Sequence, residues 1–139
     1  MPIIDVNVIL RTHLLADVTL AALVGTRIYA PNLPQNVTLP AIALFVRGGV
    51  ATPYIPGTPE PSFQITCWAD RAADAREVYD AVYNCLQGIQ NVDVVVGVDT
   101  YQIMSAIEET QGQDLQDPDA LNYFKTLGFF KIMMRASLT

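Results

Sequence analysis

The stretch from residue 63 to residue 88 constrains the fold most, because four successive signals in it agree. Residues 63–69 (FQITCWA) are rich in β-prone side chains and predict a strand. Asp70 follows as a predicted helix N-cap, and Gly88 is placed to end that helix in a left-handed conformation. Between them, apolar side chains recur at the spacing of one helical face: Ala75, Val78, Tyr79, Val82 and Leu86. The stretch therefore predicts a strand followed by a helix over 71–87.

The composition favours one domain over residues 1–139 that is rich in apolar side chains for its size. Apolar residues make up 51% of the chain and charged residues only 16%. Either the core is large or partners cover part of the apolar surface. No apolar run reaches the length of a membrane span, and no signal-peptide pattern is visible. We therefore expect a protein of a cytosol-like compartment that does not enter a membrane.

Elements on the N-terminal side of this stretch follow from the same signals. Residues 3–15 predict a helix with Asp5 near its start, and a second short helix is expected from Asp17 to Gly25. Residues 27–29 read as a short extended segment, followed by irregular, proline-containing chain. Residues 41–47 form a predicted strand with apolar side chains on both faces. We therefore expect both faces of this strand to be buried, or one of them to contact a partner.

The connection over residues 48–61 is rich in proline and glycine and is long for a link between neighbouring strands. Such loops are more often functional than structural, and the apolar Tyr54 and Ile55 have no local core to join. We therefore predict a contact loop rather than a linker. Its candidate interaction residues are Tyr54, Ile55, Pro56, Gly57 and Glu60.

The C-terminal half predicts further strands. Residues 92–98 and 101–109 are expected to form a hairpin, with Tyr101, Ile103 and Ile107 on one face. A polar loop is expected over 111–120 and a final β-prone segment over 121–135. The predicted fold is α+β, a mainly antiparallel sheet with an N-terminal helix and one long central helix packed on it.

A search for catalytic and metal-binding patterns is mostly negative. His13 is the only histidine, no serine lies in a nucleophile elbow, and no glycine-rich phosphate loop is present. Cys67 and Cys85 are too few for a disulfide framework and lack metal-ligand spacing, so we expect free, buried thiols. Glu108 and Glu109 are neighbours on a strand and point to opposite faces, so they cannot converge on a substrate. We predict no catalytic residue, no cofactor and no metal.

The net charge of −6 argues against a nucleic-acid-binding surface, because the eight basic residues are scattered along the chain. Trp68, at the end of its predicted strand, is interpreted as a packing or interface residue rather than a ligand-stacking one.

Several short motifs follow one another in an order that resembles one known family. They are residues 21–25 (AALVG), residues 26–29 (TRIY), Pro34 with Gln35, Leu39 with Pro40 before an apolar strand, and the 63–69 strand with its helix, closed by Leu86 and Gly88. This order is similar to that of the tail-terminator (tail-completion) proteins of long, non-contractile-tailed bacteriophages. The similarity in pattern covers residues 5–88, and the final strand pair fits in outline. Loops 48–61 and 111–120 depart from a compact version of the family, so no contact is carried over to them.

The resemblance implies a non-enzymatic virion protein without a cofactor. Its expected form is a homohexameric ring at the head-proximal end of the tail, assembled in the host cytoplasm. The ring would cap the tail tube, stop tube growth and present the surface for head-tail joining. Its expected partners are other copies of itself, the tail-tube protein and the head-completion or connector protein, with the tape-measure protein as a further candidate. DNA would pass through without specific binding, and no membrane is involved.

Four acidic residues are candidates for the channel of such a ring: Asp93, Asp99, Glu108 and Glu109. A negative channel would repel phosphates and let DNA slide without being held.

Two alternatives stay open. One is another component of the same assembly, a head-completion (stopper) protein of the neck or a tail-tube subunit. The other is a small cytosolic α+β domain that binds a ligand or catalyses a reaction, which requires a concave pocket with converging polar groups.

Overall fold

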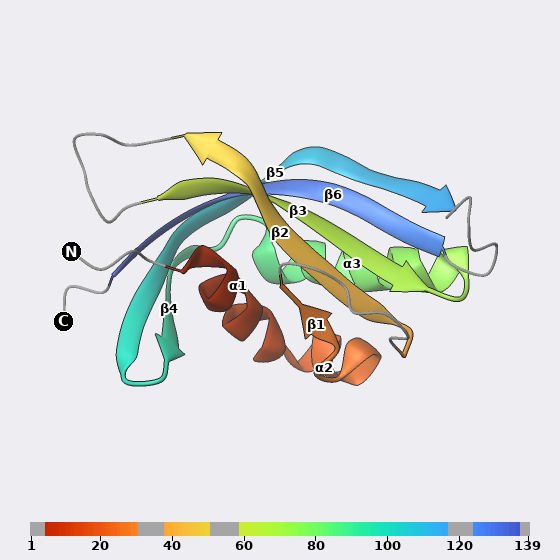
Figure 1. Ribbon diagram of the computed structural model, residues 1–139, viewed down its shortest axis with the longest axis horizontal. Coiled ribbons are helices and arrows are strands. Elements are labelled where there is room, and N and C mark those ends of the chain that lie inside the picture. Colours follow the sequence, from red (N-terminus) through yellow and green to blue (C-terminus); the bar gives the residue numbers. More distant parts are fainter. Residues whose placement is uncertain (1–4, 31–37, 51–58, 117–123, 137–139) are drawn as a thin grey trace.

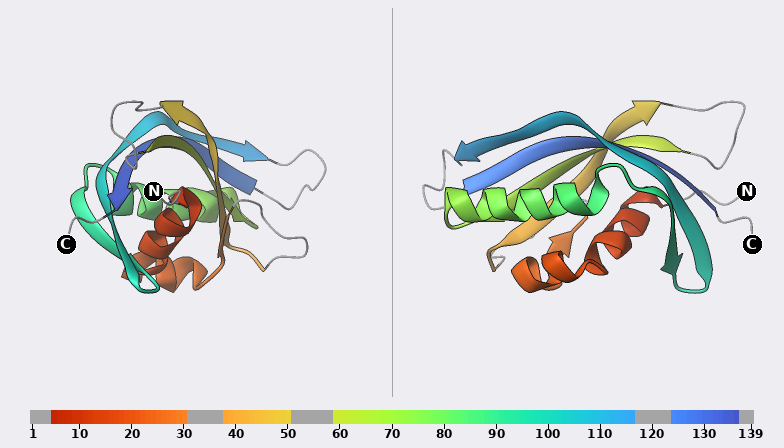
Figure 2. Two further views of the ribbon diagram at one scale, coloured as in Figure 1. Left: turned by 60° about the vertical axis from the view of Figure 1, so that its left-hand side comes forward. Right: turned by 180° about the vertical axis from the view of Figure 1, so that it is seen from behind.

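The predicted strand is an inner strand of one curled sheet, and the helix that follows it packs on the concave face of that sheet (Figure 1 and Figure 2). The computed structural model describes residues 5–30, 38–50, 59–116 and 124–136 (Figure 1). Its elements are α1 (Val6–Leu15), α2 (Val18–Val24), β1 (Ile28–Tyr29), β2 (Ala41–Val50), β3 (Glu60–Ala69), α3 (Ala72–Leu86), β4 (Gln90–Val96), β5 (Asp99–Gln116) and β6 (Phe124–Ala136).

The strands form one six-stranded sheet in the order β1-β2-β3-β6-β5-β4. The short β1 pairs with β2 in parallel, and all other neighbouring pairs are antiparallel. The three helices lie on the concave side of this curled sheet, with α1 and α2 on one part of it and α3 on another (Figure 2). The predicted α+β class with a mainly antiparallel sheet is confirmed.

Helix ends mostly follow the predicted capping signals. The Asp5 and Asp17 side chains accept hydrogen bonds from the amides of Val8 (3.4 Å) and Leu20 (3.1 Å). Gly25 ends α2 with φ of 61°, and Gly88 follows α3 with φ of 78°, both in the left-handed region that glycine tolerates.

The predicted cap of α3 is wrong. Its N-cap is Arg71 in an extended conformation, and no side chain there bonds a first-turn amide. Because β3 continues to Ala69, the chain needs both Asp70 and Arg71 to turn from the strand into the helix. Asp70 therefore lies one position too early to cap.

The core lies between the concave face of the sheet and the helices. Its largest fully buried side chains are Phe63, Phe130, Ile9, Leu10, Leu14, Leu20, Ile28, Ile42, Leu44, Ile65, Leu86 and Ile103. In the described part of the chain, no single helix is long and apolar enough to cross a membrane. Helices α1 and α2 together could do so by length and composition alone, but they are bent by 89° and pack into this core.

Three strands are longer than the sequence predicts. Strand β2 runs to Val50 and β3 begins at Glu60, although the composition of 48–61 predicts a loop. Strand β5 runs to Gln116, although the polar composition predicts a loop from residue 111. The reason is pairing, because Val50 aligns with Glu60 and Gln116 with Phe124. A paired neighbour outweighs the weak strand propensity of Gly, Gln and Asp.

The register of β5 shifts along its length, and one predicted face is therefore wrong. An irregularity between Ile103 and Ser105 changes which residues face the helices. Ala106 is fully buried, whereas Ile107, expected to share a face with Ile103, is 54% exposed.

Candidate interaction surfaces

The outer face of the sheet, which points away from the three helices, carries adjacent rows of partly exposed apolar side chains. Phe63 and Ile65 are buried against the helices, so their neighbours along β3 point outward. The register aligns Gln64 with Phe45 on one side and Phe129 on the other, which places two aromatic rings in one row. The partly exposed apolar residues of this face are Phe45, Trp68, Leu127, Phe129, Met133, Ile107 and Leu115.

A polar network crosses the centre of this outer face. The Arg47 Nε donates to Ser62 Oγ (3.0 Å), and its guanidinium lies 3.9 Å from the centroid of the Phe129 ring. The Ser62 hydroxyl donates in turn to Glu109 (2.5 Å). These contacts order β2, β3, β6 and β5 relative to one another through side chains as well as through the backbone.

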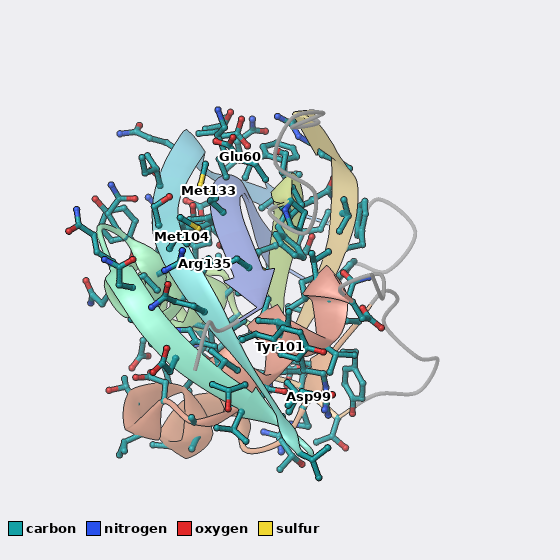
Figure 3. All side chains as sticks on the ribbon, turned by 90° about the vertical axis from the view of Figure 1, so that its left-hand side faces the viewer. Glu60, Asp99, Tyr101, Met104, Met133 and Arg135 are labelled. Carbon is teal, nitrogen blue, oxygen red and sulfur yellow. The ribbon has the colours of Figure 1, made fainter. Side chains whose placement is uncertain are left out.

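Charged side chains extend the outer face toward the end of the sheet shown in Figure 3. The Lys131 ammonium lies 3.1 Å from a carboxylate oxygen of Glu60, and Arg135 Nε donates to the Gln102 side chain (2.8 Å). Figure 3 shows Glu60, Met133, Met104 and Arg135 following one another along this end. The surface therefore combines thioether and charged side chains.

On the opposite face, Tyr79 of α3 fits a slot that two glycines leave in the sheet. A Cβ atom at Gly128 would lie 2.5 Å from Cε2 of the Tyr79 ring, and one at Gly112 would lie 2.6 Å from Cε1. The Tyr79 hydroxyl donates a hydrogen bond to Glu108. Burial, followed by the bond to Glu108 and the charge of that residue, raises the pKa of Tyr79 far above its ordinary value. The phenol is a fixed, neutral anchor between α3 and β5.

A shallow polar hollow of about 240 Å³ opens beside this anchor. Arg76 crosses it, donating to the carbonyl oxygen of Gly112 (3.1 Å) and lying 3.8 Å from Asp114. The hollow is lined by Arg76, Tyr79, Asp80, Tyr83, Glu108, Gln111 and Gly112. Arg76, Tyr79 and Glu108 are used in holding α3 to β5.

His13 and Cys85 lie 3.5 Å apart between α1 and α3, a spacing that invites comparison with a nucleophile–base pair. The electrostatics do not support that comparison. Burial lowers the pKa of His13, despite the opposing contact with Cys85 and the charge of Asp17. Burial, with a smaller contribution from Asp17, raises the pKa of Cys85 to about 12. Both groups are therefore held neutral, whereas a catalytic thiol needs a lowered pKa.

Within the described ranges, no group of three or more His, Cys, Asp or Glu side chains could hold a metal ion. Cys67 and Cys85 are free thiols, as expected, and Cys67 is fully buried while Cys85 is half-buried. Burial raises the pKa of Cys67 as well.

The predicted contact-loop residues divide between two situations. Tyr54, Ile55, Pro56 and Gly57 lie outside the described residues. Glu60 belongs to β3, where it aligns with Val50 and pairs with Lys131, so it is a strand residue of the outer face rather than a loop residue.

The four acidic residues predicted to share one surface are not brought together. Asp93 of β4 and Asp99 at the start of β5 are exposed on the β4–β5 hairpin. Glu108 points toward α3, and Glu109 points to the outer face, in agreement with the opposite directions expected for neighbours on a strand.

Two strand segments, which we call overhangs, have an edge without a neighbouring strand, and no sequence pattern predicts them. Among the described residues, β1 aligns with β2 only at Ile42 and Ala43, which leaves one edge of residues 44–50 without a strand. Strand β4 aligns with β5 only up to Ser105. Contacts from Gly88 and Gln87 continue to Ala106 and Glu108, so the β5 overhang is residues 109–116.

The chain is similar to known proteins in both sequence and fold. The sequence profile of the family described as Tail completion protein gp17 matches residues 8–130. A solved chain from the virion of a native gene transfer agent (GTA) particle has a similar fold, with a TM-score of 0.66 and 21% sequence identity over 94% of both chains. Among curated proteins, none matches this sequence.

Proposed function

Because the chain belongs to the Tail completion protein gp17 family and is therefore a structural protein of a virion tail, we propose that it is a tail terminator. In this role it forms a homohexameric ring that caps the finished tail tube, stops tube growth and provides the surface for head-tail joining. The ring sits at the head-proximal end of the tail and is assembled in the host cytoplasm. It acts without enzymatic activity or a cofactor.

The observation that carries this proposal is the family match, which spans nearly the whole chain, from the first helix to the last strand. The outer face supports it physically. A subunit of a tail assembly must bury surface against its partners, and the partly exposed Phe45, Phe129 and Ile107 offer apolar area of the kind that interfaces bury. The tail-tube protein and the head-completion or connector protein occupy the two ends of the ring, and any contact with the tape-measure protein is made from the tube side.

Within this ring, Asp93 and Asp99 are the proposed channel residues, since both are exposed and neither shares the hydrogen bonds that hold Glu108 and Glu109. Their charge would keep DNA moving without specific binding. Rings of the double variant Asp93→Lys/Asp99→Lys should retain DNA at low salt, and wild-type rings should not. Equal DNA retention by both proteins would reject the acidic channel.

Tyr54, Ile55, Pro56 and Gly57 remain proposed contact residues for the tube or a neighbouring subunit. Tyr54→Ala/Ile55→Ala should assemble less well than the wild type under identical conditions. Thr58→Ala in the same stretch serves as the matched control. Equal assembly by all three proteins would remove the assignment.

Electron microscopy with mass measurement tests the terminator role. The protein mixed with tail tubes should appear as a single six-subunit ring at one tube end. Indefinite polymerisation of the protein by itself would instead identify a tube subunit. A monomer that ignores tubes and is stabilised by a small molecule would favour a ligand-binding domain.

A further inference from the structure

Each overhang ends in residues that form a strand where the sequence predicts a loop. Loops are expected over residues 48–61 and 111–120, whereas the chain is extended and paired on one side at residues 48–50 and 111–116. Residues 109–116 (ETQGQDLQ) have weak strand propensity, are mostly polar and, up to Leu115, mostly exposed, and among the described strands only β6 pairs with them. A strand edge without a neighbouring strand presents unpaired backbone N–H and C=O groups with which another chain can pair.

The β2 overhang lies toward one edge of the sheet and the β5 overhang toward the opposite edge. A subunit that joins a copy of itself on each side needs its two contact surfaces on opposite edges. Figure 1 shows the end of β2 at the upper left and the end of β5 at the upper right. In the order β2-β3-β6-β5 every pair is antiparallel, so β2 and β5 run in opposite directions. When β2 of a second copy is placed beside β5 without rotation in the sheet, the new pair is also antiparallel. Placed beside β4, it would be parallel, unlike all the long strand pairs of the sheet.

Neighbouring strands allow only a staggered pairing. Strand β1 blocks the edge of β2 up to Ala43, and β4 blocks the edge of β5 up to Ser105. The open lengths, residues 44–50 and 109–116, therefore meet when one copy is displaced by several residues along the strands. A constant displacement of this kind is what a closed sheet of tilted strands requires.

Charge distinguishes this pairing from a two-fold one. Arg47 is the only charged residue of the β2 overhang, and it is exposed. The β5 overhang carries Glu109 and Asp114 and no basic residue. Arg47 and Glu109 both point to the outer face, so pairing β2 with β2 or β5 with β5 would bring like charges together there, whereas pairing β2 with β5 brings opposite charges together.

We propose that subunits of this protein join edge to edge, with the β2 overhang of one copy paired antiparallel to the β5 overhang of the next. The occupant of each open edge is thus a second copy of this chain, and backbone hydrogen bonds across the junction make the sheets continuous around the ring. Arg76 already donates to the carbonyl oxygen of Gly112, so one acceptor of the β5 overhang is held from within the subunit. This inference rests on the proposed ring and adds the surfaces that close it.

Hydrogen–deuterium exchange measured by mass spectrometry tests the junction directly. Dilute subunits are compared with assembled rings, taken free or recovered on tail tubes. Peptides over 44–50 and 109–116 should exchange at least about tenfold more slowly in the ring, because paired strand amides are protected. Peptides of β4 should not change, since its outer edge takes no part. Rings in which β4 is protected and both overhangs are not would overturn the edge-to-edge junction and leave the terminator role intact. A protein that forms no ring, either free or on tubes, would reject both proposals.

Charge reversal gives an independent test. Arg47→Glu and Glu109→Arg should each prevent ring formation, and the double variant Arg47→Glu/Glu109→Arg should restore it, because both side chains point to the outer face and each junction takes one residue from each copy. Arg71→Glu, an exposed reversal at the start of α3, is the matched control and should form rings. Melting temperatures of all variants identify any loss of folding, since Arg47 and Glu109 also have contacts inside the subunit. Folded single variants that assemble as the wild type does would contradict the junction.

Discussion

Replacing Gly128 by alanine should destabilise the protein because the added methyl group would overlap Tyr79. A Cβ atom at this position would lie 2.5 Å from Cε2 and 2.6 Å from Cζ of the Tyr79 ring, well inside van der Waals contact. Tyr79 cannot move aside freely, since it is 2% exposed, contacts the Phe130 ring at 6.2 Å between centroids, and is bonded to Glu108. Overpacking of this kind costs about 1–3 kcal/mol. For a chain of this size, a loss of about 2 kcal/mol lowers the melting temperature by about 8 °C.

A double-mutant cycle isolates the contact. Tyr79→Ala alone should cost about 3–5 kcal/mol through loss of a buried aromatic ring. In that background Gly128→Ala has room for its methyl group and should be neutral or slightly stabilising, because alanine loses less backbone entropy than glycine on folding. The coupling free energy from urea denaturation should therefore be about 2 kcal/mol. An equal cost of Gly128→Ala in both backgrounds would refute the slot.

Three further predictions concern the helical side. The free energy of unfolding should fall as the pH drops through and below 6.5, the ordinary pKa of histidine. The pKa of His13 is lowered in the folded protein, so the unfolded chain binds more protons in this range. Urea denaturation at several pH values should show this fall, and His13→Asn should remove it. Cys85, whose pKa is about 12, should be alkylated at pH 8 on the order of 10³-fold more slowly than a free thiol, and a comparable rate would contradict its burial. Asp17→Ala should cost about 1 kcal/mol by removing the cap of α2, and Asp5→Ala should cost less because its bond is longer, 3.4 Å against 3.1 Å; thermal melts of the two variants rank them.

Local signals in the sequence predict the elements whose structure depends on local interactions. The 63–69 strand, its helix and Gly88 follow from spacing and from the preference of glycine for a left-handed backbone. The cap at Asp17 follows from a side chain that can reach an amide three residues away, and Asp5, expected near the start of the first helix, caps α1 in the same way. The prediction for Asp70 is wrong because a cap depends on where the chain turns, which the preceding strand decides.

The strand ends and the face of Ile107 depend on pairing with distant segments, and no local signal reports that pairing. Residues 109–116 read as a loop by composition and form a strand because β6 lies beside them. The change of face after Ile103 comes from a bulge, which inserts one residue into the alternation. Of the predicted interaction residues, Glu60 belongs to a strand. The overhangs could not be predicted, because an open edge is visible only once the neighbours of each strand are known.

The proposed role makes one measurement decisive, the growth of tail tubes in the presence of this protein. Purified tube subunits are polymerised with and without it, and the tubes are imaged by electron microscopy over time. We expect one six-subunit ring at a tube end and no further growth at that end, with longer tubes where the protein is left out. Incorporation of the protein along the tube wall, or unchanged growth at ends that carry it, would contradict the terminator role.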